Sequence, residues 1–72
     1  MVISLQNLEK ALSELSETSI ALDINSDLRE YIKDSIDLGE TLAILNLEID
    51  LSKFKNVYTA AEFLNVVNQE NE

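Results

Sequence analysis

The sequence predicts a small all-α protein, and three observations lead to that prediction. The chain of 72 residues has no proline and one glycine, so few positions would interrupt a helix. Leucine, glutamate, alanine and asparagine occur throughout. Apolar residues also recur at three- and four-residue spacing in separate segments of the chain. A chain of this length is expected to form a single domain, residues 1–72, with one core.

The composition excludes several kinds of chemistry. Without cysteine there is no disulfide or thiolate metal site, and without histidine the commonest general base and metal ligand are missing. No glycine-rich phosphate-binding loop is present either, so we expect no enzymatic activity. Fourteen acidic against five basic residues give a net charge of −9. This charge disfavours nucleic acid and anionic lipid as partners and favours basic protein surfaces.

The hydropathy pattern bears on location. No stretch approaches the roughly 20 apolar residues of a membrane span, and the amphipathic N-terminus carries no apolar signal run. We therefore expect a cytoplasmic monomer with no membrane partner and no nucleic-acid partner.

The first helix is predicted over residues 4 to 16. Its leucines fall on one stripe, at Leu5, Leu8, Leu12 and Leu15. Ser4 is the predicted N-cap, because a serine hydroxyl accepts a free N–H of the first turn. Ile3 is placed to pack against Leu8 across that cap.

Residues 17 to 33 lack a sustained helical period and are predicted to form a long loop. Its apolar residues, expected to fill the core from one side, are Ile20, Leu22, Ile24, Leu28 and Ile32. The first three alternate with polar residues, but a single strand would have no partner here. One helical turn is expected at residues 29 to 31.

This loop also resembles a calcium-binding EF-hand loop over residues 23 to 34. Residues 23 to 27 match the first five positions, and Asp34 takes the twelfth. The sixth position is Leu28, where the sharp turn requires glycine, and the twelfth carries Asp in place of Glu. An acidic loop with capping side chains therefore explains the pattern better, and we expect no metal site.

The second helix is predicted over residues 35 to about 46. Asp34 is its expected N-cap, and Asp37 lies in the first turn, where acids complement the partial positive charge of a helix N-terminus. Ser35 then takes the first helical position with its hydroxyl near the surface. A phosphate ester on that hydroxyl would lie beside unpaired backbone N–H groups, which favour an anion.

The second helix is apolar over more than one face. Leu38, Leu42 and Leu45 are predicted to face the core, and Asp37, Glu40, Thr41 and Ile44 to lie opposite, with Ile36, Ala43 and Leu47 in a third row. Either the helix is central and covered nearly all round, or Ile36 and Ile44, rimmed by acids, form an exposed docking strip. Gly39 costs such a helix about 1 kcal/mol relative to alanine. It either admits another backbone or is simply tolerated.

Residues 47 to 58 are predicted to form an extended link. Its apolar residues alternate, at Leu47, Ile49 and Leu51. Ser52 is expected to cap a short turn that directs Phe54 inward.

The last helix is predicted over residues 60 to about 68. Thr59 and Glu62 form a capping box before it, and Tyr58 and Phe63 can form a hydrophobic staple across it. The residues expected to be buried are Ala60, Phe63, Leu64 and Val67. Residues 68 to 72 are polar and are expected to fray.

Asp34-Ser35-Ile36-Asp37 followed by an apolar helix resembles the phosphopantetheine attachment site of acyl carrier proteins, whose usual form is Asp-Ser-Leu. The order of predicted elements resembles that family over almost the whole chain. The resemblance implies an acyl-carrier-like four-helix bundle, with three main helices, one short helical turn and a long first loop. It also implies 4′-phosphopantetheine on Ser35, carrying fatty acyl, polyketide or aminoacyl groups as thioesters.

The implied partners are a phosphopantetheinyl transferase and acyl-processing or synthase enzymes with basic surfaces. The docking residues are Asp34, Ile36, Asp37 and Glu40 from the resemblance, and Ile44 from the docking strip.

The chain departs from the family in three ways. Ile32 and Lys33 stand where a glycine commonly precedes the aspartate, Ile36 replaces leucine, and the second helix is about one turn short. These departures point to a divergent, stand-alone carrier. The alternative is an acidic helical adaptor in which Ser35 is only a first-turn residue, with the calcium-binding loop as a third hypothesis.

Overall fold

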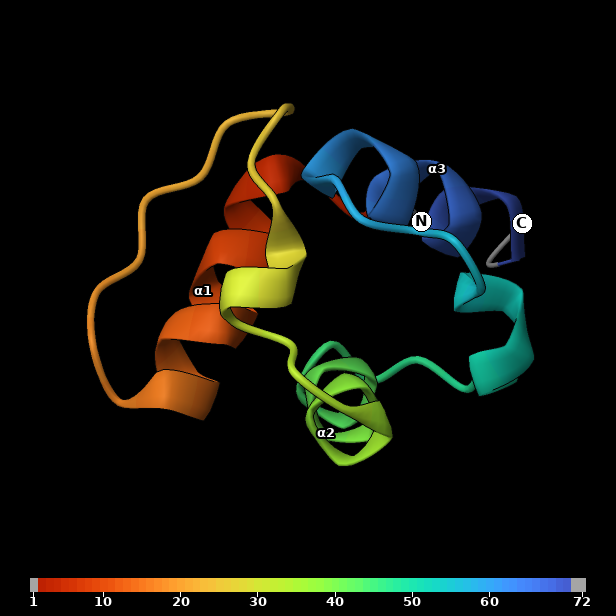
Figure 1. Cartoon of the computed structure of the whole chain (residues 1–72), viewed down its shortest axis with the longest axis horizontal. Coiled ribbons are helices and arrows are strands. Elements are labelled where there is room, and N and C mark those ends of the chain that lie inside the picture. Colours follow the sequence, from red (N-terminus) through yellow and green to blue (C-terminus); the bar gives the residue numbers. More distant parts are fainter. Residues whose placement is uncertain (1, 71–72) are drawn as a thin grey trace.

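The structure, a computed structural model, describes residues 2–70, which form three α-helices joined through two short 3₁₀ turns (Figure 1). In chain order these are α1 (Leu5–Ser16), η1 (Leu28–Glu30), α2 (Ser35–Ile44), η2 (Leu51–Phe54) and α3 (Ala60–Glu70). The prediction of an all-helical class is confirmed for these residues. The finer prediction of a four-helix bundle stays a prediction.

The helices are arranged around α1. This helix packs against both α2 and α3, and η2 contacts both α2 and α3. In Figure 1 the long loop after α1 runs along the outer side of that helix before the chain turns back into η1. One side of α2 faces solvent, since Ser35, Ile36, Glu40 and Ala43 are exposed.

The core is built mainly from α1 and α3. Leu8 and Leu12 of α1 and Phe63 and Val67 of α3 are fully buried. Phe63 stacks on Phe54 of η2, with 5.1 Å between ring centroids. The ends of the predicted leucine stripe, Leu5 and Leu15, are only half-buried at the edge of the core. The same is true of Leu38, Leu45 and Leu64.

The N-terminus of α1 is capped as predicted. The Ser4 hydroxyl accepts the Asn7 N–H at 3.2 Å, and the Asn7 side-chain oxygen accepts the Ser4 N–H at 2.9 Å. This reciprocal pair satisfies two donors that a helix start would otherwise leave open.

Asn68 holds the N-terminal segment against α3. Its side-chain oxygen accepts the Ile3 N–H at 2.7 Å, and its Nδ2 donates to the Ile3 carbonyl at 3.0 Å. The expected fraying from residue 68 is therefore wrong as far as Glu70, where α3 ends. Residues 71 and 72 lie outside the described residues.

Two side chains of α1 hold the long loop. Glu9 Oε2 accepts the Leu22 N–H at 2.7 Å, and Ser13 Oγ accepts the Ile20 N–H at 3.0 Å. Leu22 is buried, as predicted for a loop that fills the core, whereas Ile24 is exposed and contributes nothing there. The helical turn expected at 29 to 31 lies one residue earlier, at η1.

The second helix differs from its prediction at two places. It ends at Ile44. Asn46 then takes a left-handed conformation with φ 61°, and the Leu47 N–H donates a hydrogen bond to the Leu42 carbonyl at 2.9 Å. Thr41, placed on the outer face by the sequence, is completely buried. Its hydroxyl donates to the Asp37 carbonyl at 2.8 Å, so burial leaves no unpaired polar group.

The link to α3 is capped differently from the prediction. Asp50, not Ser52, is the N-cap of η2, because Asp50 Oδ1 accepts the Ser52 N–H at 3.0 Å. Phe54 is buried, as expected.

Candidate functional site

Carboxylates fix the start of α2. Asp34 is the N-cap, as predicted, and its Oδ1 accepts the Asp37 N–H at 3.0 Å. Asp37 Oδ2 in turn accepts the Lys33 N–H at 3.1 Å. The two acids therefore hold the chain on both sides of Ser35 and determine where the helix begins.

Ser35 is the first residue of α2 and is exposed. Among residues 2–70, its hydroxyl makes no hydrogen bond, and neither do the backbone N–H groups of Ser35 and Ile36. The helix start thus presents an accessible hydroxyl beside two unsatisfied backbone donors.

The other predicted docking residues differ in exposure. Ile36 is 68% exposed, and Asp34, Glu40 and Ala43 are also exposed, so α2 is not covered all round. Ile44 is 38% exposed and lies on the side of α2 that faces α1. It belongs to a groove of about 270 Å³ between these helices, lined by Ile3, Asn7, Lys10, Ala11, Glu14, Ile44 and Leu45. Ile36 and Ile44 are thus both exposed, and the docking strip that joins them stays a prediction.

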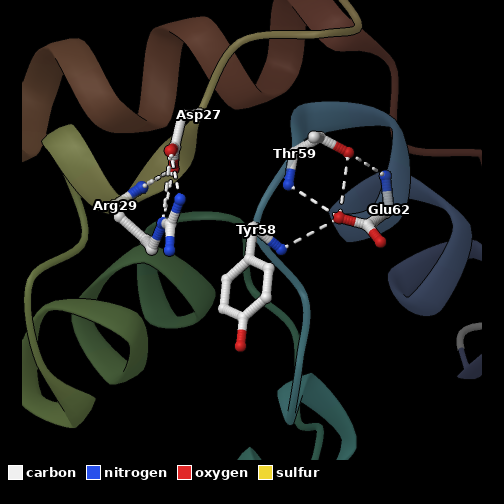
Figure 2. Close-up of polar contacts among 5 residues, drawn as sticks. All are labelled: Asp27, Arg29, Tyr58, Thr59 and Glu62. Atoms are coloured by element: carbon white, nitrogen blue, oxygen red, sulfur yellow. Dashed lines mark hydrogen bonds and ion pairs between the residues drawn. The ribbon is translucent and has the colours of Figure 1, made fainter.

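A second polar cluster closes the start of α3 (Figure 2). The Thr59 hydroxyl accepts the Glu62 N–H at 3.2 Å, and Glu62 Oε1 accepts the Thr59 N–H at 3.0 Å and the Tyr58 N–H at 3.1 Å. These bonds, led by that from Thr59, lower the pKa of Glu62 below its ordinary value. The predicted capping box is confirmed.

Arg29 joins the loop to this cluster. Its Nη2 lies 2.7 Å from Asp27 Oδ2, and its guanidinium carbon lies 4.5 Å from the centroid of the Tyr58 ring. The hydrogen bonds from Arg29 lower the pKa of Asp27 to about 2. Tyr58 is 42% exposed under Arg29, and Phe63 stacks on Phe54. The staple between Tyr58 and Phe63 stays a prediction.

The acids of the EF-hand-like segment have separate structural roles. Asp23 Oδ1 accepts the Asn25 N–H at 2.7 Å, Asp27 caps η1, and Asp34 caps α2. Within the described part of the chain, no three acidic residues are grouped so that they could hold a metal ion.

The contact between Arg29 and Tyr58 and the groove beside α1 were not predicted. The spacing of Asp27 and Arg29 could have indicated their ion pair, because an N-cap acid lies close to the second residue after it. Tyr58 belongs to a distant segment, and no local signal places it under Arg29.

Comparison with family models, with curated proteins and with solved structures gives no match for this chain. None of the helices within residues 2–70 combines the length and apolar character needed to cross a membrane. The proposed function therefore depends on the chain's own residues and on the geometry of the α2 start.

Proposed function

We propose that the chain is a divergent carrier protein of the acyl carrier type, with 4′-phosphopantetheine attached to Ser35. The observation that carries this proposal is the exposed, unbonded hydroxyl of Ser35 beside the free N–H groups of Ser35 and Ile36. The Asp34-Ser35-Ile36-Asp37 motif supports it. Three helices with two short helical turns and a long first loop are also compatible with the four-helix arrangement of such carriers.

The residues around Ser35 fit a phosphodiester. The two free N–H groups can donate to phosphate oxygens, and the positive end of the helix dipole favours their charge. Asp34 fixes the helix start, and Ser35 beside it is exposed. When bound, the arm supplies a terminal thiol on which acyl, polyketide or aminoacyl groups are held as thioesters.

The chain itself would act by presenting this group to other enzymes. Asp34, Asp37 and Glu40 provide negative charge around Ser35, and Ile36 provides an exposed apolar contact. Complementary charge mainly speeds encounter with basic partner surfaces. The partners are a phosphopantetheinyl transferase and the acyl-processing or synthase enzymes that use the loaded carrier.

The test is loading with coenzyme A and a promiscuous phosphopantetheinyl transferase, followed by intact-protein mass spectrometry. We expect one added phosphopantetheine on the wild-type chain and none on Ser35→Ala, which should keep its circular dichroism spectrum and melting temperature. Ser52→Ala, which removes another exposed serine, is the matched control and should load normally. Loading of Ser35→Ala, or no loading of the wild type, would favour the acidic adaptor.

A further inference from the structure

Lys33 is an exposed base two residues before the proposed attachment site. Asp37 Oδ2 accepts the Lys33 N–H at 3.1 Å, which holds the backbone of this residue in place. Its ammonium group, however, makes no ion pair within residues 2–70, where the salt bridge found joins Arg29 to Asp27. The Lys33 side chain is therefore available to a group that the chain does not itself contain.

The backbone between Lys33 and Ser35 favours one side of the chain for both side chains. Asp34, which separates them, has the extended angles φ −152° and ψ −179°. Alternate side chains of an extended segment point the same way. Residues two apart in such a segment are separated by roughly 7 Å, which the flexible four-carbon stem of a lysine can cross toward a phosphate on Ser35.

The surroundings of Ser35 carry an excess of negative charge. Asp34, Asp37 and Glu40 are acidic, and a phosphodiester on Ser35 would add one more negative charge. The free N–H groups of the helix start supply only about half of one positive charge. Lys33 is the one base within five residues of Ser35, so it is the nearest full positive charge along the sequence.

We propose that the ammonium group of Lys33 pairs with the phosphodiester on Ser35, while the N–H groups of Ser35 and Ile36 donate to the same phosphate. Lysine binds phosphate as a point charge, without the fixed geometry of arginine. This inference rests on the proposed carrier function and makes Lys33 the residue that holds the attached end of the arm against the helix start. Lys33 is one of the two residues that stand where such carriers commonly have glycine, so the contact is a feature of this chain.

The test compares the melting temperatures of unloaded and fully loaded chains, with loading verified by intact-protein mass. At low salt, loading should raise the melting temperature of the wild type by about 2 °C more than that of Lys33→Ala. The difference is small because an exposed ion pair is weak, but a domain of this size converts small gains in stability into measurable shifts. In 1 M sodium chloride the difference should vanish, because the Debye length falls to about 3 Å. Equal loading shifts in the two proteins at low salt would overturn the proposal.

Two variants separate the contact from a general effect of charge. Lys10→Ala removes the same charge at the other end of α2, since Lys10 lines a groove with Ile44 and the ten residues of this helix span about 15 Å. It should keep the wild-type loading shift, and so should Lys33→Arg, which preserves the positive charge. A loss of the shift in Lys10→Ala as large as in Lys33→Ala would mean that overall repulsion explains the result, and the proposal would be overturned.

The loading step itself distinguishes the two levels of the inference. If the wild type is not loaded at all, the carrier proposal fails and the Lys33 contact fails with it. If the wild type loads and Lys33→Ala shows the same loading shift, only the contact fails. If Lys33→Ala folds but does not load, whereas Lys10→Ala does, then Lys33 acts on the transferase and not on the bound phosphodiester, which also overturns the contact.

Discussion

The starts of α2 and α3 are both capped by a side chain, but they differ in whether the backbone N–H groups of their first two residues find an acceptor. At α3 the chain itself accepts them, because Ala60 N–H donates to Ser26 O and Ala61 N–H to Ile24 O, each at 3.0 Å. At α2 the equivalent first two donors, on Ser35 and Ile36, have no acceptor within residues 2–70. The long loop thus closes one helix start and leaves the other open.

This difference separates a structural helix start from a candidate functional one. At α3 the polar contacts join the loop to the helix, and Phe63 in the first turn is 1% exposed. At α2 the exposed Ile36 adds no packing, and two free donors remain for an external anion. Closing a helix start stabilises the fold, whereas an exposed open start leaves backbone N–H groups that water or a bound anion can satisfy.

The largest contrast is expected for the apolar residues of the two first turns. Phe63→Ala should lower the free energy of unfolding by about 3–5 kcal/mol, enough to unfold a domain this small. Ile36→Ala should change it by no more than about 0.5 kcal/mol, the usual range for a surface site. Urea denaturation followed by circular dichroism measures both. A comparable loss in Ile36→Ala would mean that the α2 start is also structural.

The next contrast concerns the caps. Thr59→Ala and Asp34→Ala should each destabilise the fold by about 1 kcal/mol, because each leaves first-turn donors unsatisfied. Loading of Ser35 should be unaffected by Thr59→Ala in the folded protein and reduced by Asp34→Ala.

Asp34→Asn is the matched control for charge, since asparagine still caps a helix. If it loads as slowly as Asp34→Ala, the negative charge matters; if it loads at the wild-type rate, the cap matters. Equal slowing by Thr59→Ala would remove the distinction between the two helix starts.

The smallest effect is expected from acid titration of the Asp27–Arg29 contact. Because the folded-state pKa of Asp27 is lowered to about 2, its stabilising effect is present above the ordinary aspartate pKa of about 3.9 and is lost as pH falls toward 2. The melting temperature should therefore fall less steeply over this window in Asp27→Asn than in the wild type. The effect is small because the pair is exposed.

Arg29→Ala is the control for this titration. It removes the partner that lowers the Asp27 pKa and should reduce the pH dependence in the same way. An identical pH dependence in all three proteins would show that the Asp27–Arg29 ion pair does not lower the pKa of Asp27 in solution.

Sequence reasoning placed all three helix starts because their signals are local. Ser4, Asp34 and Thr59 cap their own helices through bonds to residues three positions away. It was wrong about Thr41, because the buried side of α2 is set by the positions of α1 and η2 and not by polarity alone. The hydroxyl bond to the Asp37 carbonyl makes that burial tolerable.

For the candidate site, the sequence by itself determined the residue types and their order: an acid, a serine, an isoleucine and an acid before an apolar helix. Only the tertiary structure decided that Ser26 and Ile24 close the start of α3 and that Ile44 lies beside α1. The physical reason is range. Caps act within one turn of helix, whereas satisfaction of the remaining donors and the exposure of each helix face depend on which distant segments fold against them.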